Sequence, residues 1–278
     1  MEKGFEHNTF KKRLSSMLRV DFRRIFTMPF VYIIVGTCFL MSIIILVMTT
    51  MMDGSISVNP QTGEETIIEG FDNVWQIIGT VSANDAALGG MTADAGAGMS
   101  MDLVSMCNIN MLYFLIAVLV CVFIAQDFRS GYVKNLFTVR AKKSDYVISK
   151  TIVCFIGGAL MIFAFFAGSM LGGAIVGLPF DMAGFNVGNA VMCILSKLLL
   201  VSVFVPIYII MSVIGKQKLW LSLILSLMVG MFMFMMIPML TPLNATIVHV
   251  ILCIAGGAMF SVGLGAISNK VLNRTSLV

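Results

Sequence analysis

The sequence alternates between six long apolar segments and the polar stretches that separate them. The apolar segments are residues 30–52, 103–125, 151–178, 190–214, 219–240 and 245–267. Each has about twenty residues or more, the length that an α-helix needs to cross a hydrocarbon core of about 30 Å. The pattern therefore predicts an all-α polytopic membrane protein with six transmembrane helices.

The basic residues are confined to four of the polar stretches. All but one of the 18 Lys and Arg residues lie in residues 1–29, 126–150, 215–218 and 268–278. The other three connections between apolar segments carry no Lys or Arg. Basic residues close to the ends of spans are retained on the cytoplasmic side of a membrane. We therefore expect a multi-pass protein of the cell membrane with its N- and C-termini in the cytoplasm. The exception, Lys197, lies within the fourth apolar segment.

The composition excludes several classes of function. With 59% hydrophobic and 12% charged residues, the chain is too apolar to be an ordinary soluble domain. Its pI near 8.8 reflects juxtamembrane basic residues without a nucleic-acid recognition motif, so we expect the lipid bilayer and no nucleic acid as a partner. Phosphate-binding loops, metal-ligand motifs and paired carboxylates within a span are all missing, so we expect no catalytic residue and no bound cofactor or metal.

Residues 1–29 are expected to form an amphipathic helix at the cytoplasmic interface, over residues 9–28. Its apolar residues recur mostly at three- and four-residue intervals and include Phe10, Leu14, Met17 and Leu18, whereas basic residues, Arg23 among them, lie largely on the opposite side. Such a helix anchors a protein to anionic lipids, and it also suits contact with a cytosolic subunit. The two roles are compatible.

Residues 53–102 form the longest connection, an acidic loop that we expect on the extracellular side. It is long enough to fold over the outer end of the bundle. Phe71, Val74, Trp75 and Ile78 have helical spacing, which predicts a short amphipathic helix resting at the outer membrane surface through Trp75. Residues 85–100 are rich in Gly and Ala and are expected to be mobile. The loop is either a solvated lid or a part of substrate handling.

Residues 126–150 are longer than two spans need as a connection. Asp127 and Ser130 are capping residues, Val133, Leu136 and Phe137 give a first helix an apolar edge, and Ser144 with Asp145 offers a second helix start that runs into the third span. An apolar edge bordered by basic residues is suited to docking into a groove on another protein. Binding to anionic lipid is the alternative.

The same segment resembles a known family. Residues 127–135 read DFRSGYVKN and precede a basic cluster and Ser149-Lys150. This run is similar to an element of bacterial type 2 ABC transporter permeases, most closely the small unfused permeases of bacteriocin, lantibiotic or bacitracin immunity and of peptide export. The layout of the whole chain resembles theirs, although the re-entrant helices that larger members carry between the last two spans have no counterpart here.

The resemblance implies a six-span permease domain over residues 30–278 without an ATPase of its own. Its partners would be cytosolic nucleotide-binding ATPase subunits, which hold ATP and Mg, and a second permease, identical or different. The loop 126–150 would supply the coupling contact with the ATPase, flanked by the interface helix. The residues that this assigns to coupling are Asp127, Arg129, Gly131, Lys134, Asn135, Leu136, Phe137, Arg140, Lys142 and Lys143.

We therefore expect the transmembrane subunit of an ATP-driven exporter in a bacterial cell membrane, with a peptide, lantibiotic-like or other amphipathic substrate. The alternatives are an ion-coupled transporter or channel, and a membrane-embedded accessory or sensor subunit. Ion-coupled carriers ordinarily hold several ionisable groups within their spans, whereas this chain offers Lys197 and His249.

Four further features of the spans carry expectations. Lys197 is expected either to snorkel to the outer headgroups or to contact substrate. Two stripes of small residues, Ala164, Gly168 and Gly172 and then Gly257, Ser261 and Gly265, predict close helix packing within a subunit or across a dimer. Pro206 predicts a kink in the fourth span. The methionine-rich residues 228–236 favour adaptable packing or a greasy substrate surface over a copper path.

Overall fold

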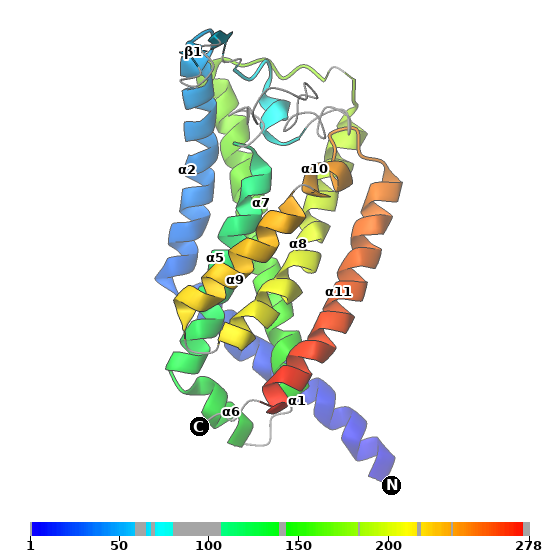
Figure 1. The fold of residues 1–278 in the computed structure, drawn as a ribbon. Helices are drawn as coiled ribbons and strands as arrows, with labels where there is room; N and C mark the ends of the chain where they lie inside the picture. Colours follow the sequence, from blue (N-terminus) through cyan, green and yellow to red (C-terminus); the bar gives the residue numbers. More distant parts are fainter. Residues whose placement is uncertain are drawn as a thin grey trace.

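The computed structural model describes residues 2–58, 65–67, 70–79, 107–138, 143–182, 184–215, 218–234 and 236–274. Long helices form a bundle, and one further helix crosses its end (Figure 1). The helices are α1 (Glu2–Thr27), α2 (Pro29–Met52), α5 (Leu112–Arg129), α6 (Tyr132–Thr138), α7 (Lys143–Val176), α8 (Val187–Gly215), α9 (Leu219–Phe234), α10 (Met236–Leu240) and α11 (Ile247–Arg274). Short elements are β1 (Ile56–Val58), β2 (Glu65–Ile67) and the 3₁₀ turns η1 (Val74–Ile77) and η2 (Ile109–Met111).

The predicted all-α polytopic fold is confirmed. Five helical segments among the described residues are long and apolar enough to cross a membrane: Pro29–Met52, Ile109–Arg129, Lys143–Val176, Val187–Gly215 and Ile247–Leu272. The sixth apolar helix, α9, has 16 residues, about 24 Å of helix. The fifth span was expected over residues 219–240, and α9 and α10 are the described helical parts of it, with residue 235 between them outside the described residues.

Three helices extend further than their apolar segments predict. α1 begins at Glu2, α7 begins at Lys143 and α11 continues to Arg274. With 34 residues, α7 is about 51 Å long and extends beyond a hydrocarbon core of about 30 Å. Hydrophobicity locates only the part of a helix that lies in lipid. The helix itself extends as far as its backbone hydrogen bonds continue.

One end of the bundle collects all four basic stretches. α1, α6, the start of α7, the connection from α8 to α9 and the end of α11 lie together there (Figure 1). We call it the basic end. At the opposite end, β1 and β2 form an antiparallel pair in which Ile56 lies opposite Ile67, and η1 packs beneath it.

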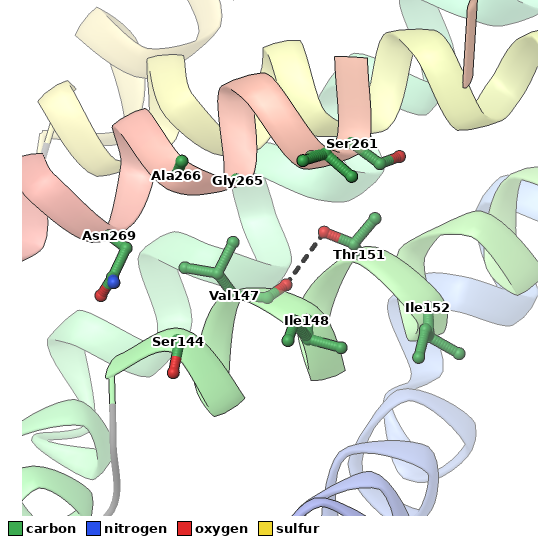
Figure 2. Close-up of a pocket in the computed structure, with 10 residues that line it drawn as sticks. Ser144, Val147, Ile148, Thr151, Ile152, Ser261, Gly265, Ala266 and Asn269 are labelled. Carbon is green, nitrogen blue, oxygen red and sulfur yellow. Dashed lines mark hydrogen bonds between the residues drawn. The ribbon is translucent and has the colours of Figure 1, made fainter. Parts of the chain in front are cut away.

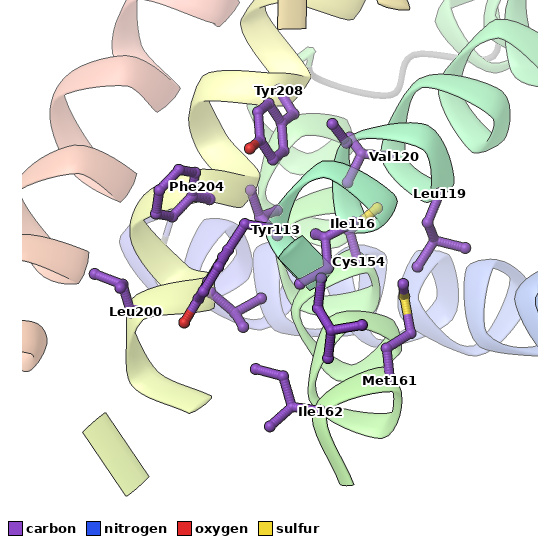
Figure 3. Close-up of a cluster of buried hydrophobic side chains, with 14 of the residues drawn as sticks. Tyr113, Ile116, Leu119, Val120, Cys154, Met161, Ile162, Leu200, Phe204 and Tyr208 are labelled. Carbon is purple, nitrogen blue, oxygen red and sulfur yellow. The ribbon is translucent and has the colours of Figure 1, made fainter. Parts of the chain in front are cut away.

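The centre of the bundle consists of α5 and α8, with α7 beside them. Tyr113, Ile116 and Val120 of α5 face Phe204 and Tyr208 of α8 (Figure 3). The rings of Tyr113 and Phe204 are 4.7 Å apart between centroids. In contrast, few residues of α11 are buried, so this helix lies at the outside.

Glycines bring two pairs of helices into close contact, as the small-residue stripes predict. A Cβ atom at Gly168 of α7 would overlap the carbonyl of Phe39 and the Ser42 side chain of α2. A Cβ atom at Gly257 of α11 would overlap Ser202 of α8. Both contacts lie within one chain. Gly265 differs, because nothing lies within 4 Å of the position its Cβ would take.

α9 attaches to the bundle through a small-residue stripe that the sequence analysis did not identify. Its buried residues are Ser222, Ser226 and Gly230, each four positions apart. The Ser226 hydroxyl and the Cys121 thiol of α5 are hydrogen-bonded at 3.2 Å. The opposite face carries large exposed side chains, including Met228, Met231 and Phe232. Met228 and Met231 therefore belong to an outer surface, whereas Met233 packs partly against the core.

Trp75 does not rest at the membrane surface, as the helical spacing suggested. It is buried, and its indole N–H donates a hydrogen bond of 3.2 Å to the carbonyl of Phe180, in the connection between α7 and α8. The edge of its ring meets Phe185 at 5.7 Å between centroids. The described part of the long loop thus folds back onto the bundle. The Gly- and Ala-rich residues 85–100 lie outside the described residues.

We predict that Gly168→Ala destabilises the contact between α2 and α7, because the added methyl group meets a backbone carbonyl that cannot move aside. Thermal unfolding in detergent should show a loss of about 1–3 kcal/mol, the usual cost of overpacking. Gly36→Ala in α2 is the matched control, since nothing lies within 4 Å of its Cβ position. Equal unfolding temperatures for the two variants would contradict the assigned contact.

Candidate functional site

The segment between α5 and α7 makes a sharp turn at the basic end. α5 ends at Arg129, and the Ser130 N–H donates a hydrogen bond of 2.9 Å to the carbonyl of Gln126. Gly131 then adopts the left-handed conformation, with φ of 71°, which only glycine adopts at little cost. The Asn135 N–H donates to the Gly131 carbonyl at 3.1 Å and so continues into α6. The chain therefore changes direction here and α6 extends from the end of the bundle (Figure 1).

Docking through the apolar edge of α6 would require that edge to be exposed, but it faces the chain's own bundle. Val133 is buried, and Leu136 and Phe137 are half-buried against the chain's own bundle. The Phe137 ring meets Tyr146 of α7 edge-on, at 5.9 Å between centroids. Lys134 and Asn135 are exposed instead. The face that α6 offers to a partner is polar and basic, and its apolar edge holds the helix in place.

A buried ion-pair cluster lies directly behind α6. The Lys150 ammonium of α7 lies 2.7 Å from a carboxylate oxygen of Asp21 in α1 and 2.7 Å from one of Asp127 in α5. All three side chains are fully buried. One cation thus joins three helices. Its partner Asp21 lies 129 residues earlier in the sequence than Lys150.

Both carboxylates have further partners. The Ser149 hydroxyl donates a hydrogen bond of 2.6 Å to the second oxygen of Asp21, and the Tyr146 hydroxyl donates one of 3.0 Å to the Asp127 oxygen that also faces Lys150. Arg24 of α1 forms a close ion pair with Asp127 at 2.6 Å, without the alignment of a hydrogen bond. Buried charges tolerate removal from water only when they are paired and hydrogen-bonded in this way.

Aromatic rings enclose the cations. The Lys150 ammonium lies 4.0 Å from the centre of the Phe123 ring, and the Arg24 guanidinium lies 4.2 Å from that of Tyr132. Ring faces attract cations, most strongly where water is excluded. Burial, followed by the charges of Asp21 and Asp127, raises the pKa of the Tyr132 phenol, which keeps this ring neutral beneath Arg24.

A further pair extends the contact between α1 and α7 towards solvent. The Arg13 guanidinium lies 3.2 Å from a carboxylate oxygen of Asp145. The ion pairs at this end therefore involve three carboxylates, of Asp21, Asp127 and Asp145, and three cations, of Arg13, Arg24 and Lys150. These six formal charges sum to zero, so the contact costs little net electrostatic repulsion.

The structure separates the predicted coupling residues into three groups. Arg129, Lys134 and Asn135 are exposed beside or on α6, next to the turn at Gly131. Asp127, Leu136 and Phe137 face the bundle, and the Lys143 ammonium donates a hydrogen bond of 2.7 Å to the Leu272 carbonyl of α11. Arg140 and Lys142 lie outside the described residues.

The interface helix packs on the bundle through a narrower face than its apolar pattern suggests. Met17 and Ile25 are buried together with Asp21, and the three share one side because they are four residues apart. Leu14 and Leu18 are half-buried, whereas Phe10 and Arg23 are exposed. Asp21 was not among the residues predicted from the sequence. The signal was an acidic residue midway between two apolar ones in a helix otherwise rich in basic residues.

Lys197 lies far from this cluster, and it does not snorkel to the headgroups. Its side chain is fully buried, and its ammonium donates hydrogen bonds to Asn110 at 3.0 Å and to Thr241 at 2.8 Å. Its own carbonyl accepts a hydrogen bond of 2.9 Å from the Tyr113 hydroxyl. Lys197 therefore joins α8 to the start of α5 and to the end of α10. His249 accepts a hydrogen bond from the Thr246 N–H at the start of α11.

Comparison with known protein families decides the broader identity. A family model described as "ABC-2 family transporter protein" matches residues 28–233, about three quarters of the chain. The chain belongs to the ABC-2 transporter family. None of the curated proteins and none of the solved structures matches it. As an ABC-2 permease it is a multi-pass membrane protein of a class that works with ATPase subunits. All of α1, α10 and α11 lie outside the matched residues.

We predict that Lys150→Met destabilises this ABC-2 permease by about 3–5 kcal/mol, because Asp21 loses its cation and becomes a buried, uncompensated charge, while Asp127 keeps only its pair with Arg24. Thermal unfolding in detergent measures the change. Lys134→Met, at an exposed lysine of α6, is the control and should stay within about 0.5 kcal/mol. Adding Asp21→Asn to Lys150→Met should recover part of the loss, and a purely additive double variant would contradict the pairing.

Proposed function

We propose that this chain is the permease subunit of an ATP-driven exporter and that the polar face of α6 is its contact with the ATPase. The observation that carries the proposal is the combination of an exposed basic face with a buried ion-pair cluster directly behind it. A helix of seven residues is not stable alone, so its position must come from tertiary contacts. Val133, Phe137 and the turn at Gly131 supply those contacts.

The cluster behind α6 suits the transmission of movement. Asp127 lies in the last turns of α5, Lys150 lies in α7, and Asp21 and Arg24 lie in α1. A force on α6 therefore reaches two spans and the interface helix through ion pairs that are buried away from water. In this proposal, ATP binding brings two ATPase subunits together, and α6 passes that displacement to α5 and α7.

The chemistry of the exposed face indicates what it binds. Arg129 and Lys134 are cations and Asn135 offers an amide, so the matching groove on an ATPase carries acidic side chains. α1 adds a second basic surface, a hollow of about 690 Å³ lined by Lys11, Lys12 and Arg19. This hollow suits anionic lipid headgroups or the rim of the same ATPase. The basic end then lies in the cytoplasm, together with both termini.

The substrate class follows from the outer face of α9. Met228, Met231 and Phe232 are largely exposed, and flexible thioethers adapt to ligands of varied shape. We assign this face to a second permease, identical or different, and to a peptide, lantibiotic-like or other amphipathic substrate between the two. Lys197 contacts such a substrate only if α5, α8 and α10 separate, because Asn110 and Thr241 occupy its ammonium in this arrangement.

We predict that Arg129→Glu with Lys134→Glu abolishes docking by reversing the charge of the α6 face. Co-expression with an ATPase encoded beside the permease, followed by affinity purification, should recover at least tenfold less ATPase than with the unaltered chain. Lys218→Glu is the matched control, because Lys218 is also exposed at the basic end but lies at the start of α9. Thermal unfolding should be the same for both variants.

Full recovery of the ATPase with the double variant would contradict the α6 contact. Transport by purified permease in liposomes without any ATPase would instead favour an ion-coupled transporter or channel, and the proposal would fail. Stable binding without any stimulation of ATP hydrolysis would favour an accessory or sensor subunit.

A further inference from the structure

A groove opens between α7 and α11 at the basic end, away from the α6 face. It has a volume of about 490 Å³. Val147, Ile148 and Ile152 line it from α7, and Val262, Gly265 and Asn269 line it from α11 (Figure 2). Gly265 leaves space in its wall, since nothing lies within 4 Å of its Cβ position. Val262 is 75% exposed and Ile148 39% exposed, so the groove is open along its apolar rim.

The length of the groove matches one leaflet of a bilayer. Its lining on α11 runs from Ser261 to Asn269 and that on α7 from Ser144 to Ile152, about 12 Å of helix in each case. Half of a hydrocarbon core is about 15 Å. A transmembrane helix of a partner would pack along about 30 Å, whereas this groove is about 12 Å long. An acyl chain of one leaflet fits that length.

The polarity of the lining changes along its length. At the inner end, the Thr151 hydroxyl donates a hydrogen bond of 2.9 Å to the Val147 carbonyl, and the Ser261 hydroxyl donates one of 3.3 Å to the Ser202 carbonyl. These hydroxyl groups are satisfied within the chain, so their surroundings are effectively apolar. Ser144 and Asn269 lie at the other end, beside the basic end (Figure 2). The groove is therefore effectively apolar at its inner end and polar towards the basic end.

The charge at the polar end is positive. Lys143 precedes Ser144 and Lys270 follows Asn269, and Lys270 is exposed. The nearest acid in the sequence, Asp145, is buried and paired with Arg13. A phosphate group placed at this end meets the exposed Lys270 and the Asn269 amide, whereas the Lys143 ammonium already donates to the Leu272 carbonyl and the Ser144 hydroxyl to Asp145.

We propose that this groove binds one acyl chain of an anionic phospholipid from the leaflet at the basic end, with the phosphate held near Ser144, Asn269 and Lys270. A lipid at this position joins α7, which carries Lys150, to α11, which has few buried residues of its own. The proposal is independent of which substrate the permease exports.

Native mass spectrometry of the purified chain, titrated in detergent with phosphatidylglycerol and with phosphatidylcholine, tests the acyl-chain site. Gly265→Leu fills the groove and should lower binding of both lipids at least fivefold. Gly263→Leu is the matched control, because its Cβ position is equally open but does not line the groove. Equal lipid binding by the two variants overturns the proposal.

The headgroup part of the proposal has its own test. Lys270→Glu should lower phosphatidylglycerol binding at least fivefold and leave phosphatidylcholine binding within twofold. Equal binding of both lipids by the unaltered chain would overturn the preference for an anionic headgroup. Cross-linking decides whether protein occupies the groove instead: a dimer formed in membranes through Gly265→Cys, but not through Gly263→Cys, would show that a second copy fills it and would overturn the lipid site.

Discussion

The contact between Lys150 and the carboxylates of Asp21 and Asp127 is the constraint on which the basic end of this protein depends. It places one ammonium between three helices in a region that water does not reach. Without Lys150, Asp21 loses the one ion pair it makes among the described residues, and Asp127 keeps only its pair with Arg24. The position of α1 across the end of the bundle, and the position of α5 relative to α7, follow from this contact.

α6 derives its orientation from the same region. The turn at Gly131 begins three residues after the last buried residue of α5, Phe128, and Phe137 packs against Tyr146, whose hydroxyl group binds Asp127. The apolar edge of α6 is therefore committed to the chain itself. Its polar face is what a partner meets, and ABC-2 permeases work with ATPase partners. The contact between permease and ATPase that we propose is consequently electrostatic and polar, on a rigid apolar base.

Hydrophobicity was sufficient to predict the spans, because lipid imposes a length and a composition on each helix. It also located the small residues of α7 that pack against α2, since four-residue spacing places them on one face. It did not predict the partners of Lys150, because Asp21 lies 129 residues away and pairing over that distance leaves no local pattern. For the same reason Lys197 was expected either to snorkel to the headgroups or to contact substrate, and its hydrogen bonds to Asn110 and Thr241 inside the bundle were not predicted.

Site-directed cross-linking between α6 and the ATPase in native membranes tests the central claim most directly. Single cysteines at positions 135 and 133 lie on different sides of α6, because Asn135 is exposed and Val133 is buried. We expect Asn135→Cys to form a cross-link to the ATPase and Val133→Cys to form none. Cross-linking through Val133→Cys, or through neither position, would show that the polar face of α6 is not the docking contact.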